Sequence, residues 1–224
     1  MCRTAKDFVL GLELQGTSSA TVDTYLDEAV GLLAEIRARS DNRLLDNPQI
    51  WGVENETAKA LYTLVRITRP STVLETGIGN GVSSFIILSA LSSNNHGRLI
   101  STEVSSRVGA IVGGDEKARW TVQTFEPRTS TEEFVHLVEG LDSIDLFMHD
   151  SDHSYNHQSM EYTSVLPKMS GNSLITSDDV DYSYAFVDFT EDLKTRAKFL
   201  LDGRKVFGAV RPPHLRASAT GNPR

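Results

Sequence analysis

From residue 71 onward, short apolar segments of strand length alternate with segments of helical periodicity. The predicted strands are 71–77, 97–104, 119–125, 143–150 and 172–179, followed by two strands about Asp202-Gly203. The predicted helices among them are 82–93, 130–141, 155–169 and 185–196. Alternating strands and helices build a parallel sheet with helices on both of its faces. The hairpin signal at Asp202-Gly203 adds an antiparallel strand at one edge.

Two further helices are predicted before the first strand, at 21–39 and 55–68. The first carries one apolar stripe, made of Val22, Tyr25, Ala29, Leu32 and Ile36. This stripe can pack on its own domain or on a second subunit, so a homodimer is possible. The expected organisation is a helical extension at 1–52, one α/β domain at 53–210, and a tail at 211–224. That tail has no periodicity and is expected to be mobile.

Composition narrows the class of protein. The 224 residues are 39% hydrophobic and 23% charged, which is ordinary for a globular protein. A net charge of -8 argues against nucleic acid as a partner. The single cysteine, Cys2, excludes an intrachain disulfide and a cysteine-based zinc cluster. No apolar run approaches the ~20 residues of a membrane-spanning helix. We therefore expect no membrane partner and a cytoplasmic location.

The segment "ETGIGNG", residues 75–81, leaves a predicted strand and enters a predicted helix. Its glycines, at 77, 79 and 81, permit a tight turn and a close approach of a ligand to the backbone. The helix that follows offers free N–H groups at its start. The spacing G-x-G-x-G differs from the dinucleotide fingerprint G-x-G-x-x-G, and the lysine of a P-loop is absent. A triphosphate is therefore not the expected ligand.

Glu103 ends the next predicted strand, 22 residues after Gly81. A carboxylate at this position can accept hydrogen bonds from both hydroxyls of a ribose. The glycine turn and Glu103 together predict a pocket for a nucleoside that needs no phosphate clamp.

Four segments in this order, "VLETGIGNG", "STEV", "DLFMHDSDHSY" and "LITSDDV", resemble a class I S-adenosylmethionine-dependent methyltransferase. Within that class the chain is similar to the methyltransferase-24 type, related to catechol O-methyltransferase and the metal-dependent sugar O-methyltransferases. The resemblance covers residues 53 to about 210. It implies a Rossmann-like, doubly wound seven-stranded sheet in the order 3-2-1-4-5-7-6, with the last strand antiparallel.

The resemblance also implies which residues bind S-adenosylmethionine. The Gly77–Gly81 loop would surround its methionine end, and Glu103 would hold its ribose. The predicted cofactor-binding residues are Glu75, Gly77, Gly79, Gly81, Glu103 and Asp150. No acidic residue after "TVQTF" can be assigned to the adenine amine.

The segment "FMHDSDHSYNH", residues 147–157, concentrates ligand chemistry. Strands 143–150 and 172–179 are consecutive in the predicted sheet, so their carboxyl ends should lie about 5 Å apart. Asp150 would then meet Asp178 and Asp179. Three carboxylates repel one another unless a cation joins them. Oxygen ligands favour Mg²⁺ or Mn²⁺ over zinc. The predicted metal ligands are therefore Asp150, Asp178 and Asp179, and matching positions hold a divalent ion in the relatives.

A hydroxyl group that accepts a methyl group must lose its proton, and two neighbours of Asp150 can act as the base. Asp152 and His153 both match positions that the resemblance associates with this role. Histidine titrates nearest neutrality, so we predict His153 as the base and Asp152 as an orienting residue or alternative base. His149 is expected to be a core or supporting residue, and His157 a surface residue.

The expected function is metal-assisted O-methylation of a small hydroxyl-bearing acceptor such as a sugar, a phenol or a polyol. Two alternatives remain open at the level of sequence. A metal-dependent nucleotide-sugar glycosyltransferase would explain Asp150-x-Asp152 but neither the glycine turn nor Asp178-Asp179. A non-catalytic S-adenosylmethionine-binding module would explain the turn and Glu103 alone.

The acceptor pocket is expected to come from loops within 1–52, 105–118 and 180–186, of which 105–118 could form a mobile lid.

Overall fold

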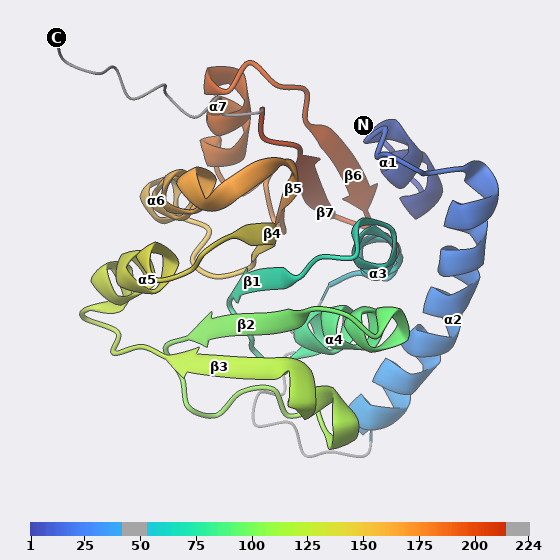
Figure 1. Cartoon of the computed structure of the whole chain (residues 1–224), viewed down its shortest axis with the longest axis horizontal. Helices are drawn as coiled ribbons and strands as arrows, with labels where there is room; N and C mark the ends of the chain where they lie inside the picture. The colour runs from blue at the N-terminus through green and yellow to red at the C-terminus, as the bar shows by residue number, and fades with distance from the viewer. Residues whose placement is uncertain (42–52, 214–224) are drawn as a thin grey trace, which may run out of the picture.

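The computed structural model describes residues 1–41 and 53–213, and a seven-stranded sheet runs through its centre (Figure 1). The strands are β1 (Thr72–Thr76), β2 (Arg98–Glu103), β3 (Trp120–Thr124), β4 (Ile144–His149), β5 (Met169–Ser177), β6 (Lys198–Asp202) and β7 (Lys205–Val210). Their order is β3-β2-β1-β4-β5-β7-β6. Strands β1 to β5 pair in parallel, and β7 runs antiparallel to both β5 and β6. The predicted fold class and strand order are confirmed.

Helices cover both faces of the sheet. They are α1 (Ala5–Gly11), α2 (Ser19–Asp41), α3 (Asn55–Thr68), α4 (Val82–Asn94), α5 (Ser130–Glu139), α6 (Tyr155–Val165) and α7 (Ala185–Asp192). Figure 1 shows α1 to α4 on one side of the sheet and α5 to α7 on the other. Val73 and Leu74 are both fully buried but belong to different cores, because successive side chains of a strand point to opposite faces.

The apolar stripe of α2 packs within its own chain. Val22, Ala29 and Ile36 are buried in the core that α2 shares with α3 and α4. At the polar edge of this contact, Glu28 accepts a hydrogen bond from the Tyr62 hydroxyl and forms an ion pair with Arg66. None of the helices within the described residues combines the length and the apolar character that a membrane crossing requires.

Two segments differ from their predicted form. Helix α6 ends at Val165, a short 3₁₀ turn spans Leu166–Lys168, and β5 begins at Met169 rather than at 172. The turn contains Pro167, which lacks the N–H that a continuing helix would need. Residues 42–52 of the predicted extension and 214–224 of the predicted tail lie outside the described residues.

The segment 105–118, considered above as a mobile lid, is tied to the glycine turn. The Gly109 N–H donates to the Gly79 carbonyl at 2.9 Å, and the Ile111 N–H donates to the Asn80 carbonyl at 3.2 Å. Ile111 is fully buried, and its carbonyl accepts a hydrogen bond from Arg39 of α2. These contacts make the segment a brace for the glycine turn.

Candidate active site

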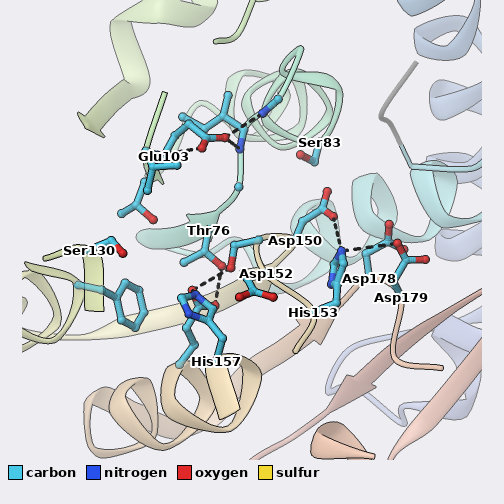
Figure 2. Close-up of a pocket in the computed structure, with 18 of the residues that line it drawn as sticks. Thr76, Ser83, Glu103, Ser130, Asp150, Asp152, His153, His157, Asp178 and Asp179 are labelled. Carbon is cyan, nitrogen blue, oxygen red and sulfur yellow. Dashed lines mark hydrogen bonds and ion pairs between the residues drawn. The ribbon is translucent and has the colours of Figure 1, made fainter. Parts of the chain in front are cut away.

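A pocket of about 600 Å³ lies at the carboxyl ends of the parallel strands. This is the edge at which open α/β sheets bind ligands, and the volume is in the range of small-molecule sites. The polar lining of the pocket includes Glu103, Asp150, Asp152, His153, His157, Glu161, Asp178, Asp179 and Lys205. Figure 2 shows how most of these side chains surround the pocket. None of the described residues from 1–41, 105–118 or 180–186 lines it, so these parts of the expected acceptor loops do not contribute to this pocket.

The glycine turn forms one wall of the pocket. Its three glycines, Gly77, Gly79 and Gly81, have φ values of 81°, 51° and 87°, a region that favours glycine. A Cβ atom on Gly77 would lie 1.9 Å from the Asp150 carbonyl oxygen, so only glycine allows this approach. A Cβ atom on Gly79 would meet no protein atom within 4 Å. Gly79 therefore leaves open space beside the pocket that a larger residue would fill.

Glu103, at the end of β2, lies against this turn. Its Oε2 accepts hydrogen bonds from the N–H groups of Ile78 at 3.2 Å and Gly79 at 3.4 Å. Figure 2 shows the Glu103 side chain among the residues that line the pocket, with its hydrogen bonds as dashed lines. The carboxylate is thus held beside the free backbone of the turn, where it can accept hydrogen bonds from a ligand.

Glu75 occupies a different place from the other predicted cofactor residues. It is fully buried and accepts hydrogen bonds at 2.6 Å from the hydroxyls of Ser84 and Ser101. Burial raises the pKa of its carboxyl group. Glu75 does not line the pocket; its hydrogen bonds join β1 to α4 and β2, and a direct contact with a cofactor stays a prediction.

Aromatic and apolar residues line the pocket near β3, the edge strand next to β2. Phe125 and Pro127 follow β3, and Phe134 lies in α5. Phe134 is almost completely buried and its ring contacts Phe147 of β4. No acidic residue of this segment was assigned to the adenine amine from the sequence, and Glu126, which follows Phe125, does not line the pocket. The structure places aromatic rings there instead, which suit the face of a planar ligand.

Three acidic residues converge where β4 and β5 end, as predicted. Asp150 follows β4, and Asp178 and Asp179 follow β5; all three line the pocket. Burial, and then the charge of Asp178, raise the pKa of Asp150. Burial also raises the pKa of Asp178, to about 6, and Asp179 adds to this rise. Burial and mutual repulsion therefore disfavour the ionised form of these carboxylates unless a nearby cation compensates their charge.

The cation that meets this charge is a lysine. Lys205, the first residue of β7, places its Nζ 3.2 Å from Asp178 Oδ2 and 3.1 Å from Asp179 Oδ2. Burial opposes the charged form of Lys205, but the attraction of these two carboxylates exceeds that effect and raises the pKa of the ammonium.

The predicted divalent-metal site, Asp150 with Asp178 and Asp179, does not form in this arrangement. Within residues 1–41 and 53–213, no group of three or more His, Cys, Asp or Glu side chains is placed to hold a metal ion. Two of the three predicted ligands already bind an ammonium group. The acidic residues are therefore arranged around the Lys205 ammonium and not around a divalent ion. No sequence pattern had indicated Lys205 as their partner.

His153 lies among the acidic residues. Its Nε2 is 3.5 Å from Asp179 Oδ2 and 3.9 Å from Asp150 Oδ1, and Figure 2 shows the ring between these carboxylates. Burial, and then the neighbouring His149, lower the pKa of His153. Asp152 instead accepts the Ser154 N–H at 2.9 Å at the start of α6, and this bond lowers its pKa. The surroundings thus favour the neutral form of the His153 imidazole and the ionised form of the Asp152 carboxylate.

Glu161, in the middle of α6, was not singled out from the sequence. Its buried carboxylate accepts hydrogen bonds from four side chains: Thr76 at 2.7 Å, His149 at 2.6 Å, Ser151 at 2.9 Å and His157 at 2.9 Å. Burial alone would raise its pKa, but His149 and His157 lower it to about 2. His157 therefore lies in the pocket wall, half-buried, and the expectation of a surface residue is wrong.

Comparison with known proteins finds a matching family model and several solved structures with a similar fold. A family model described as a methyltransferase domain, of the methyltransferase-24 type, matches residues 74–180. No curated protein matches the chain. Among solved structures, the O-methyltransferase TomG from Streptomyces achromogenes, involved in tomaymycin synthesis and crystallised with S-adenosylmethionine, has a TM-score of 0.59 at 17% identity. The match covers 80% of this chain and 90% of TomG.

Two further structures are similar. The O-methyltransferase from Bacillus cereus, in complex with S-adenosylhomocysteine, has a TM-score of 0.54 at 18% identity, covering 93% of this chain and 97% of its own. The S-adenosylhomocysteine-bound methyltransferase PaMTH1 from Podospora anserina has a TM-score of 0.57 at 12% identity, covering 86% and 88%. At these identities the structures show the fold alone. The family model matches residues 74–180, from within β1 to just past the end of β5 and including the glycine turn, so this part of the chain matches a methyltransferase domain of the methyltransferase-24 type.

Proposed function

We propose that this protein transfers the methyl group of S-adenosylmethionine to a hydroxyl oxygen of a small acceptor, such as a sugar, a phenol or a polyol. The observation that carries the proposal is the position of His153. It lies in the same pocket as the glycine turn and Glu103, so one cavity holds both a nucleoside-binding wall and a base. The glycosyltransferase alternative loses its support, because the matched family consists of methyltransferase domains.

The pocket fits the chemistry of the cofactor. The Glu103 carboxylate can accept hydrogen bonds from ribose hydroxyls, and Phe125 and Phe134 offer an apolar wall to the adenine ring. S-adenosylmethionine, when bound, supplies an electrophilic methyl group on a positively charged sulfur. The lining carboxylates outnumber Lys205, the one Lys or Arg among the described lining residues, so the pocket suits a cationic ligand.

The residues around the acceptor would manage its proton. As the acceptor oxygen forms its bond to the methyl carbon, the bond from that carbon to sulfur breaks and its electron pair stays on sulfur. The hydroxyl proton must then leave. His153 lines the pocket beside Asp150 and Asp179, so we assign its imidazole ring to accept the proton. Asp152 is the alternative base. Assistance by Mg²⁺ or Mn²⁺, expected from the resemblance, has no step in this proposal because Lys205 already pairs with two of the three predicted ligands.

Cofactor binding is tested with Gly79→Arg. We expect calorimetry to show that the wild type binds S-adenosylhomocysteine and that Gly79→Arg does not, because the new side chain enters the space beside the pocket. The positive φ of this residue adds a strain of about 1–2 kcal/mol, so circular dichroism should still show a folded protein. Wild-type binding of NAD or a uridine nucleotide in place of S-adenosylhomocysteine would contradict the proposal. Methyl transfer itself is measured as release of S-adenosylhomocysteine with a panel of sugars, phenols and polyols.

The role of Glu103 is tested separately. We expect Glu103→Ala to weaken S-adenosylhomocysteine binding by about 10- to 100-fold, since a hydrogen bond to a charged group contributes roughly 1.5–3 kcal/mol. The matched control is Glu132→Ala, which removes an exposed carboxylate of α5. Equal affinities of Glu103→Ala and the wild type would show that this carboxylate does not hold the ribose.

A further inference from the structure

Lys205 is placed in the pocket by two interactions between β7 and the loop after β5. The Val180 N–H donates to the Val206 carbonyl at 3.0 Å, and the Val206 N–H donates to Asp181 Oδ1 at 3.1 Å. These bonds hold the start of β7 beside Asp178 and Asp179. The position of the lysine is therefore built into the antiparallel end of the sheet and does not depend on a flexible surface segment.

The contact itself is largely removed from water. The Asp178 side chain is 2% exposed, and the side chains of Asp179 and Lys205 are each 24% exposed. A buried carboxylate is costly unless a partner compensates its charge, and two neighbouring carboxylates increase that cost. Asp179 adopts a φ of +47°, an unfavourable backbone conformation for a residue other than glycine. The Asp179 backbone is therefore locally strained in the conformation that keeps its carboxylate within ion-pair distance of Lys205.

We propose that the Lys205 ammonium is the resident cation of this acidic group and takes the place that the family resemblance assigns to a divalent metal ion. Two of its three N–H donors are directed to Asp178 and Asp179. The third can donate to an oxygen of the acceptor, so Lys205 orients a hydroxyl-bearing ligand next to His153. This second part rests on the proposed function, whereas the competition between Lys205 and a metal ion does not.

The inference predicts that metal binding appears when the ammonium is removed. In Lys205→Met, three carboxylates share a pocket with no lysine, and Asp178 Oδ1 is already a buried oxygen without a hydrogen-bond partner. Oxygen donors of this kind suit a divalent ion. We expect electron paramagnetic resonance and calorimetry to detect no Mn²⁺ bound to the wild type at millimolar concentration. Lys205→Met should bind Mn²⁺ at least about tenfold more tightly than the wild type.

Two further variants complete the design. Lys205→Arg keeps a positive charge and should bind no Mn²⁺. Lys168→Met changes the net charge equally but removes a lysine whose Nζ donates to the Glu139 carbonyl outside the pocket, and it should behave as the wild type. Mn²⁺ bound stoichiometrically to the wild type would overturn the inference, and so would a folded Lys205→Met that gains no binding. If Lys205→Met does not fold, the wild type and Lys205→Arg still decide, because Mn²⁺ bound to either contradicts it.

Methyl transfer provides a separate measurement. With the acceptor found in the panel, we expect wild-type activity to persist in excess chelator, and Lys205→Met to raise the KM for the acceptor by about tenfold or more while S-adenosylhomocysteine affinity stays unchanged. Loss of wild-type activity in chelator and its return with Mg²⁺ would overturn the inference. Failure of the wild type to bind S-adenosylhomocysteine would instead refute the proposed function, and the Mn²⁺ measurements would still stand.

Discussion

Replacement of His153 by alanine is expected to lower kcat by about 10²- to 10⁴-fold, the range over which a positioned general base contributes. His153 has the geometry and the charge state for this role. Its Nε2 lies 3.5 Å from Asp179, and burial lowers its pKa, so the ring is neutral and able to accept a proton at pH 7. No other histidine among the described residues lies within ion-pair distance of the acidic group.

The measurement compares kcat at saturating cofactor with the acceptor found in the panel. S-adenosylhomocysteine affinity of His153→Ala should stay near that of the wild type, because the cofactor wall is formed by the glycine turn and Glu103. The control is His136→Ala, which removes an exposed imidazole of α5. If His153→Ala keeps its kcat and Asp152→Asn loses it, Asp152 is the base and the two roles are reversed.

Substitution of Glu161 by glutamine is expected to destabilise the fold by on the order of 3 kcal/mol at neutral pH. The value follows from the difference between the ordinary carboxyl pKa of 4.5 and the pKa of about 2 in the folded protein. An ionised carboxylate only accepts hydrogen bonds, so all four of its partners donate to it. The glutamine carbonyl oxygen can accept hydrogen bonds from some of these partners. Its NH₂ group, however, is a donor that would face side chains that are themselves donors. The melting temperature should fall by about 6–12 °C in a chain of this length.

The pH dependence of this effect has a definite sign. The folded-state pKa of Glu161 is depressed, so its contribution is fully present above pH 4.5 and is lost as pH falls towards about 2. His157 has the opposite behaviour: Glu161 raises its pKa above 6.5, so its contribution is full below pH 6.5 and is lost as pH rises through the raised pKa. The network therefore stabilises the fold most between pH 4.5 and 6.5.

Thermal unfolding of the wild type and Glu161→Gln across pH 3 to 8 measures this difference. The exposed carboxylate of Glu139 provides the control, since Glu139→Gln should leave the unfolding curve nearly unchanged. A Glu161→Gln protein as stable as the wild type at pH 6 would show that the four hydrogen bonds contribute no net stability.

Much of the fold followed from the sequence because its signals are local. The alternation of strands and helices, the glycine turn, and the hairpin at Asp202-Gly203 each depend on residues close together in the chain. The convergence of Asp150 with Asp178 and Asp179 also followed, because parallel neighbouring strands bring their carboxyl ends to one edge. The boundary between α6 and β5 was misplaced, since the apolar residues there suit either structure and the 3₁₀ turn at Pro167 decides between them.

The identity of the charge partners was decided only by the tertiary structure. Glu161 has an ordinary sequence context for a polar residue on a helix, yet the packing of α6 buries it against the ends of β1 and β4. Lys205 lies 27 residues after Asp178, beyond α7 and β6, and reaches the pocket because β7 pairs with β5. The sequence determined which strand ends would carry acidic residues, because that depends on local pattern and strand order. Which cation neutralises them depends on long-range pairing, and no local pattern encodes it.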